Sequence, residues 1–316
     1  MNTQSGAVQS LQATATMPVT IPAARRFYWA VRRELWEYRS LYLAPLAIAG
    51  LFLGAFLIGQ LHDHLRGPDA IATSMQHPVP LQQSADYHVV IGPYTFAAYV
   101  LMAISLIVSV FYSLDTLYGE RRDRSVLFWK SLPVSDVTTV LAKASIPLLF
   151  LPLFIFALTV VTQWIMLLLT SVITLARGES VAILWAHVPL FQMALMLFFH
   201  LVGIHGLQFA SAYCWMLLVS AWARRAPFLW AVVPPVAIAV AEKIAFNTHY
   251  FLRLLGFLVG GGSDTVPFTE GRMEMAALTV GDVAEFFSYP GLWVGLVVAA
   301  LLLAATVRMR RSRDPI

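Results

Sequence analysis

The sequence has few charged residues and almost no cysteine. Asp, Glu, Lys and Arg make up 12% of its 316 residues, whereas a soluble domain carries about 25%. A water-soluble fold of this length needs a charged surface, and so this composition excludes an ordinary soluble protein. The single cysteine, Cys214, excludes an intramolecular disulfide framework.

Motifs that would indicate several other functions are also missing from the sequence. It has no phosphate-binding GxxxxGK motif, and its glycine run at 260–263 lacks the lysine, so we expect no ATP site in this chain. Neither HExxH nor GxSxG occurs, and we predict no catalytic residues. No basic stretch has the length or aromatic content of a nucleic-acid site. His62 and His64 lack assignable further ligands, so we predict no metal site.

Apolar residues, by contrast, make up 59% of the chain and occur in long blocks. A membrane-spanning helix needs about 20 mostly apolar residues. Six stretches qualify, which predicts an all-α polytopic membrane protein with one transmembrane domain over 41–310. The fourth is interrupted by Gly203 and Gly206, and could be one long tilted helix or a partial insertion followed by a crossing. The predicted spans are 41–60, 94–114, 145–173, 190–221, 227–246 and 290–307.

The basic residues alternate between the two sides that these spans define. Sixteen of the 21 fall before the first span, between spans two and three, between spans four and five, or after the last span. The positive-inside rule makes that side cytosolic, so we expect both termini in the cytosol. Residues 1–22 lack a signal-peptide pattern and are predicted to be a disordered cytosolic tail, with 311–316 as a second tail.

Residues 23–40 have the pattern of an amphipathic helix. Phe27, Val31, Leu35, Tyr38 and Tyr42 recur with helical spacing on one face, and basic residues occupy the rest. Such a helix lies in the headgroup region, with aromatic rings inserted and arginines near lipid phosphates. It could be a simple anchor or an elbow helix that couples cytosolic motion to the first span. The predicted anchor residues are Arg25, Arg26, Arg32, Arg33 and Trp36.

The loop between spans two and three, 117–143, is much longer than a simple turn requires. It combines dense charge with an apolar cluster at 126–132, and Pro133 ends that short helix. Ser135 is a candidate N-cap for the helix that leads into span three. We interpret the loop as a docking surface for another protein, the alternative being a solvated charged loop.

This loop also resembles that of a known family. Glu120, then Arg-Asp-Arg-Ser-Val with Leu127, then Leu-Pro-Val-Ser at 132–135 and Lys143 resemble the cytosolic loop of type-2 ATP-binding-cassette (ABC) exporter permeases. The layout of residues 25–310 is similar as well: an elbow helix, six spans, and a long external segment at 247–289. That segment is partly apolar, and short re-entrant helices fit it better than a globular domain.

The resemblance implies a permease subunit in the bacterial inner membrane. Its expected partners are an ABC ATPase subunit, which would bind ATP and Mg, a second permease chain in a homodimer, and membrane lipid. The expected cargo is hydrophobic or amphipathic: a lipid, peptide or drug. The alternative function is a non-transporting membrane sensor or assembly component with the same fold. Residues that the resemblance assigns to coupling with the ATPase are Glu120, Arg121, Arg122, Asp123, Arg124, Leu127, Phe128, Trp129 and Leu132.

Span four carries three polar side chains, His200, His205 and Gln208. Polar groups at membrane depth are costly and therefore suggest a function. They could line a substrate route, or they could form hydrogen bonds between helices.

Overall fold

The computed structural model describes residues 22–66, 85–125, 135–178, 180–260 and 280–312, and these residues form helices and turns without a strand. Helices at the start of the chain are α2 (Ala23–Glu37), α3 (Ser40–Arg66), α5 (Ala85–Arg122), α7 (Asp136–Ser145), the π-helix η2 (Ile146–Phe150) and α8 (Leu151–Ala176). They are followed by α9 (Val181–His187), α10 (Leu190–Phe198), η3 (Phe199–Gln208), α11 (Ala210–Trp222), α12 (Pro227–Phe246), α13 (Tyr250–Leu255), η4 (Gly256–Gly260), α14 (Val280–Ser288) and α15 (Pro290–Ser312).

Six helical stretches in the described part of the chain are long and apolar enough to cross a membrane. This confirms the predicted all-α polytopic architecture. Several helices extend beyond the apolar core of the predicted spans, because the polar turns at their ends remain helical. The stretches are Ser40–His62, Ile91–Arg122, Asp136–Ala176, Leu184–Gln208, Pro227–Phe246 and Pro290–Ser312.

The third stretch starts nine residues before the predicted span, at Asp136 rather than 145. Its first turn is capped as expected: the Ser135 hydroxyl accepts a hydrogen bond from the Thr138 amide at 3.1 Å. The π-helical segment η2 then joins α7 to α8 without a break. Pro147 lies in its first turn and has no N–H to donate, which accounts for the widened helix there.

The fourth stretch is divided. Residues 190–221 form α10, η3 and α11, and the chain leaves helical geometry at Phe209. Gly206 explains why this part can lie so close to its neighbour. A Cβ atom at Gly206 would lie 2.7 Å from the Leu148 carbonyl oxygen in η2, closer than a side chain tolerates. The two π-helical segments therefore touch through backbone atoms.

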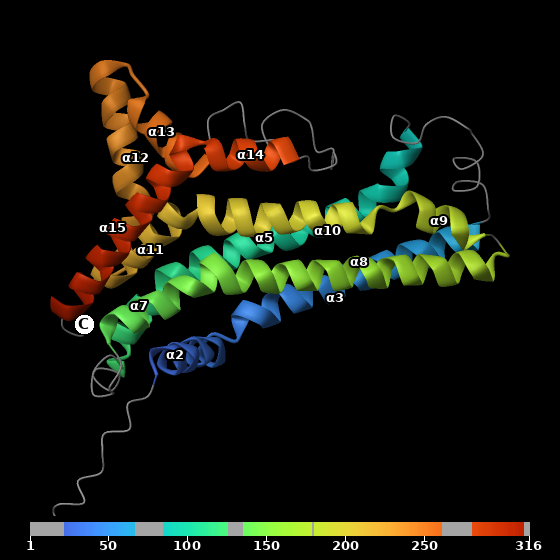
Figure 1. The fold of residues 1–316 in the computed structure, drawn as a ribbon, viewed down its shortest axis with the longest axis horizontal. Helices are drawn as coiled ribbons and strands as arrows, with labels where there is room; N and C mark the ends of the chain where they lie inside the picture. The colour runs from blue at the N-terminus through green and yellow to red at the C-terminus, as the bar shows by residue number, and fades with distance from the viewer. Residues whose placement is uncertain (1–21, 67–84, 126–134, 179, 261–279, 313–316) are drawn as a thin grey trace, which may run out of the picture.

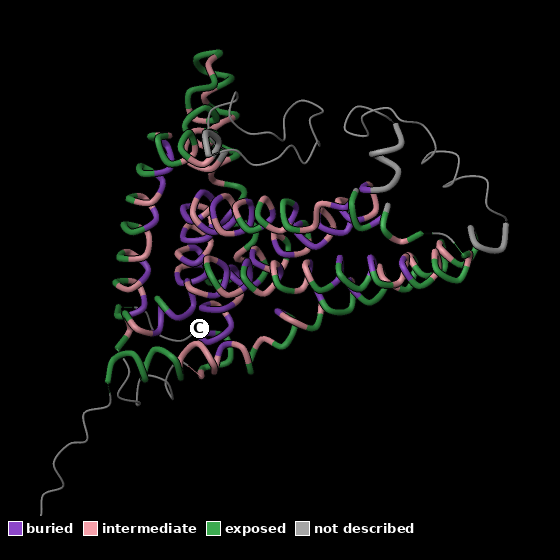
Figure 2. The backbone as a smooth tube through the Cα atoms, turned by 45° about the vertical axis from the view of Figure 1, so that its right-hand side comes forward, coloured by how far each residue is buried: buried purple, intermediate pink, exposed green. Residues whose placement is uncertain are grey.

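The buried core lies between the long helices. Helices α3, α5, α8 and α10 run alongside one another (Figure 1), and Leu101, Leu151 and Ile155 are buried between them. Helix α11 packs against both α5 and α15. Helix α12 projects away from this bundle (Figure 1) and is mostly exposed along its length (Figure 2). Ala231 is its one buried residue.

Short helices precede the last span, as the sequence predicted. Helix α13 with η4, and later α14, lie between α12 and α15, while 261–279 lie outside the described residues. Helix α15 approaches η4 closely at Gly291, where a Cβ atom would lie 2.4 Å from the Phe257 carbonyl oxygen. Glycine is therefore required at this crossing.

Helix α2 corrects one expectation. Its residues Val31, Leu35 and Tyr38 pack onto the protein core formed by Leu41 and Tyr112, so this face is not available to lipid. The face instead carries a buried carboxylate, Glu34, and its ion pair with the buried Lys143 of α7 attaches the helix to the bundle.

Candidate functional site

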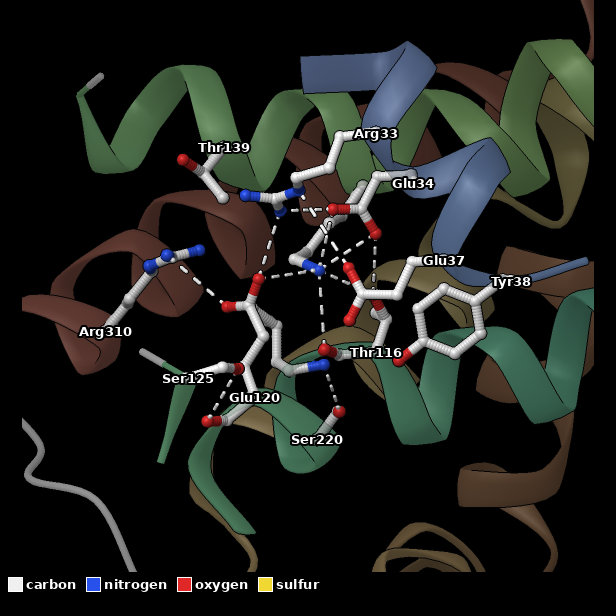
Figure 3. A network of polar contacts seen from close by, with 12 residues as sticks. Arg33, Glu34, Glu37, Tyr38, Thr116, Glu120, Ser125, Thr139, Ser220 and Arg310 are labelled. Atoms are coloured by element: carbon white, nitrogen blue, oxygen red, sulfur yellow. Dashed lines mark hydrogen bonds and ion pairs between the residues drawn. The ribbon is translucent and has the colours of Figure 1, made fainter. Parts of the chain in front are cut away.

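A network of charged side chains lies buried at one end of the bundle, where α2, α5, α7 and the C-terminal turn of α15 meet (Figure 3). Each helix contributes at least one charged group. Buried charges are costly unless they are paired and hydrogen-bonded. Such a cluster is therefore a candidate functional site.

Lys143 and Glu34 form the centre of this network. The Lys143 ammonium on α7 donates to Glu34 Oε1 at 3.0 Å and to Oε2 at 2.9 Å. Both side chains are completely buried. The same ammonium donates to the Thr116 hydroxyl of α5 at 2.8 Å, and so Lys143 joins three helices.

The Glu34 carboxylate has further donors. The Tyr112 hydroxyl donates to Oε2 at 3.0 Å, and the Thr116 hydroxyl donates to the same oxygen at 3.2 Å. Arg33 on the same helix bonds Oε1. Burial alone would raise the pKa of Glu34, but Lys143 and Arg33 outweigh it and hold that pKa below its ordinary value. Glu34 is therefore a buried carboxylate at neutral pH.

Glu120 connects the centre of the network to α2 and to α15. Its carboxylate lies 3.1 Å from the Lys143 ammonium, 3.1 Å from the Arg33 guanidinium and 3.4 Å from the Arg310 guanidinium. Arg310 in turn lies 3.2 Å from Asp136, the first residue of α7. The first and the last helix of the described residues, α2 and α15, thus meet at one carboxylate.

Arg121, the next residue of α5, makes a separate connection. Its guanidinium donates to the carbonyl oxygens of Ser220 at 2.8 Å and Ala223 at 2.6 Å. These are among the last carbonyls of α11, which lack partners within the helix. The Ser220 hydroxyl accepts from the backbone N–H groups of Leu117 and Tyr118 at 3.1 and 2.9 Å. Helices α5 and α11 are therefore fixed to each other at this end.

The network holds the chain on both sides of the segment between α5 and α7. Glu120 lies just before the segment, and Asp136 and Lys143 lie just after it. Both ends of the segment are therefore attached to α2 and α15 by ion pairs. The described residues on the two sides of the segment are thus held to the same two helices.

The predicted coupling residues divide into three groups. Glu120 and Arg121 are buried in the last turns of α5, so they do not belong to an exposed docking surface or to a separate short helix. Arg122, Asp123 and Arg124 are exposed, and Arg122 pairs with Asp123 at 3.0 Å. The others lie outside the described residues: Leu127, Phe128, Trp129 and Leu132.

The predicted anchor residues of α2 also divide. Arg33 points into the network, whereas Arg25 and Arg26 are exposed. The Arg32 guanidinium lies over the Trp29 ring at 5.0 Å and the Trp36 ring at 4.7 Å, and both rings are exposed. The exposed surface of α2 thus includes this arginine between two tryptophans.

His200, His205 and Gln208 are all buried in the π-helix η3. His200 Nδ1 lies 3.0 Å from the Met196 carbonyl oxygen of the preceding turn. The His205 ring lies 5.6 Å from the Phe209 ring, centroid to centroid. Within the described part of the chain, no group of three or more metal-ligating side chains comes together.

Sequence reasoning missed Glu34, although a signal was present. Glu34 lies three residues after Val31 and four before Tyr38, so it falls on the apolar face of α2. A carboxylate on such a face requires a buried cation. Lys143 belongs to the family-like motif and Arg310 to the basic C-terminal cluster, but neither position indicates that they share a partner.

Searches of protein-family models, curated protein sequences and solved structures found no match to this chain. The function must therefore be argued from the spans and from this network.

Proposed function

We propose that this chain is the permease subunit of an ABC exporter in a bacterial inner membrane, with both termini in the cytosol. It moves a hydrophobic or amphipathic substrate, using ATP hydrolysed with Mg by a separate ATPase subunit. Two copies of the chain form the transmembrane unit. The resemblance of residues 120–143 to the family's loop supports this, as does the set of six apolar helices.

The observation that carries the proposal is the attachment of both ends of the segment 123–135. Glu120 before it pairs with Lys143 after it, and Lys143 pairs in turn with Glu34 of α2. A solvated loop has no need of two fully buried charges at its base, which are costly to maintain. A segment that receives force from an ATPase does need such an attachment.

Because Glu120 is buried, the surface proposed to contact the ATPase subunit is smaller than the sequence suggested. The residues proposed to meet the ATPase are now the exposed Arg122, Asp123 and Arg124 and the following stretch to Leu132. Glu120 and Arg121 act instead as positioning residues: they connect the moving segment to the transmembrane helices.

The proposal is tested by replacing 124–132 with a Gly-Ser sequence of equal length, which leaves Glu120 and Lys143 intact. ATP hydrolysis that co-purifies with the tagged chain is expected to disappear, together with ATP-dependent transport in proteoliposomes. The matched control is the same replacement at 264–272. Retention of the ATPase activity after the loop replacement would overturn the coupling assignment. Retention of a nucleotide-dependent response without transport would favour the non-transporting sensor or assembly component.

A further inference from the structure

The turn between α11 and α12 carries two arginines, Arg224 and Arg225, which lie outside the buried network; we call this turn the basic corner. The chain turns at Ala226, which has a left-handed φ of 47°. Arg224 and Arg225 precede it and are exposed. Neither forms an ion pair with a carboxylate among the described residues.

The corner is held rigidly beside the end of α5. Arg121 donates to the carbonyl oxygens of Ser220 and Ala223, one residue from Arg224. Arg122 follows Arg121 directly and is exposed, with its guanidinium 5.7 Å from the Tyr118 ring. Arg122 pairs with Asp123, so its charge is balanced by that carboxylate.

Aromatic side chains flank these arginines in the sequence: Trp222 precedes them, and Phe228 and Trp230 follow them. The Trp222 and Trp230 rings are 4.8 Å apart in an edge-to-face contact. Trp230 is 46% exposed and Phe228 is 55% exposed. Helix α12 continues from here as an apolar membrane-spanning candidate that starts at Pro227. The corner therefore lies where the apolar surface of a span gives way to charge.

We propose that this corner binds the headgroup of an anionic phospholipid. Arginine bonds phosphate oxygens through a planar fork of donors. An exposed tryptophan close to the charge, here Trp230, is typical of the headgroup level, where aromatic residues collect. Basic clusters at the end of a span attract anionic lipid. The two arginines lie next to the first turn of α12 in sequence, so a phosphate at the turn and acyl chains along the apolar helix can be engaged together.

Native mass spectrometry of the detergent-purified full-length protein, titrated with phosphatidylglycerol, tests the proposal. Arg224→Gln with Arg225→Gln should weaken binding of the first phosphatidylglycerol by about 30-fold, or roughly fivefold per arginine. Phosphatidylcholine binding should be unchanged. Arg224→Lys with Arg225→Lys should retain most of the affinity, because it keeps the charge.

The matched control removes two positive charges at the other end of α12, by Lys243→Gln with Arg253→Gln. Both residues are exposed, and Arg253 lies 6.0 Å from the Tyr250 ring, as Arg122 lies beside Tyr118. An equal loss of lipid in this control would overturn the proposal, because it would show a net-charge effect. Competition by inorganic phosphate alone, or loss of co-purifying ATPase activity with unchanged lipid binding, would overturn it as well.

Discussion

Two glutamates fix helices in this protein in opposite ways. Glu34 is completely buried, and most of its partners lie on other helices: Tyr112 and Lys143 are 78 and 109 residues away in sequence. Glu242, at the end of α12, accepts hydrogen bonds from the Thr248 hydroxyl at 2.7 Å and from the backbone N–H groups of Tyr250 and Phe251 at 2.6 and 2.8 Å. Its partners are all within nine residues.

This difference in sequence distance shows which parts of the structure each glutamate holds together. Glu242 fixes a turn and the first turn of α13, a local structure that solvent can also stabilise. Glu34 joins separate segments through charges that have no access to water, so losing one partner leaves the others uncompensated. The comparison predicts large, long-range effects at the buried network and small, local effects at the α12–α13 turn.

The largest effect is expected from Lys143→Met. This change leaves the buried Glu34 and Glu120 without the fully buried one of the two cations they share, the other being Arg33, which should lower the free energy of unfolding by about 3–5 kcal/mol. The measurement is thermal unfolding of the purified protein in detergent. Adding Glu34→Gln to this variant should recover part of the loss, because the uncompensated charge is then removed.

Lys243→Met is the matched control, because Lys243 is exposed at the far end of α12 and contacts His249 at 3.1 Å. Its melting temperature should stay close to that of the wild type. Equal melting temperatures for the two methionine variants would remove the distinction between the buried network and the exposed turn.

Lowering the pH should weaken the same network, with a smaller effect on the melting temperature than Lys143→Met. The pKa of Glu34 is lower in the folded protein than its ordinary value of 4.5, because Lys143 and Arg33 outweigh its burial. The folded state therefore binds fewer protons, and this stabilisation is present above that ordinary value and lost as pH falls through the folded pKa. Melting temperatures between about pH 7 and about pH 3 should fall less steeply for Glu34→Gln than for the wild type.

Glu285→Gln serves as the control for the acid experiment, since Glu285 is exposed on α14. It should follow the wild-type pH profile. An unchanged slope in Glu34→Gln would mean that Glu34 does not supply the acid-sensitive stability.

The smallest effect is expected from Glu242→Ala. The backbone N–H groups of Tyr250 and Phe251 lose an acceptor, but exposed groups can bond water instead. Hydrogen exchange measured by mass spectrometry should become faster at 248–253 and remain unchanged in α2, α5 and α7. A change of exchange in those helices would show that the turn is coupled to the network.

Much of the fold could be predicted from local patterns. Apolar blocks of about 20 residues located the spans, Ser135 indicated the start of α7, and the segment before α15 was expected to contain short helices. Those patterns depend on residues close together in sequence. The division of the fourth stretch was harder, because the break at Phe209 follows a π-helix that packs against Leu148.

The site was less predictable than the fold. Glu120 was singled out as a coupling residue, but its burial was not foreseen, and Glu34 was not singled out at all. Helical periodicity correctly grouped Val31, Leu35 and Tyr38, yet periodicity does not distinguish a face that meets lipid from one that meets protein. Whether the face meets lipid or protein depends on which other segments pack against it in the folded chain.

By itself, the sequence determined that this protein is helical and built to span a membrane, because composition and apolar length act through the solvent that each segment requires. Only the tertiary structure decided which charges leave water. Glu34, Glu120, Lys143 and Arg310 come from four helices spread over nearly the whole chain. Their pairing exists only once those helices meet, since no buried charge is tolerable until its partner is in place.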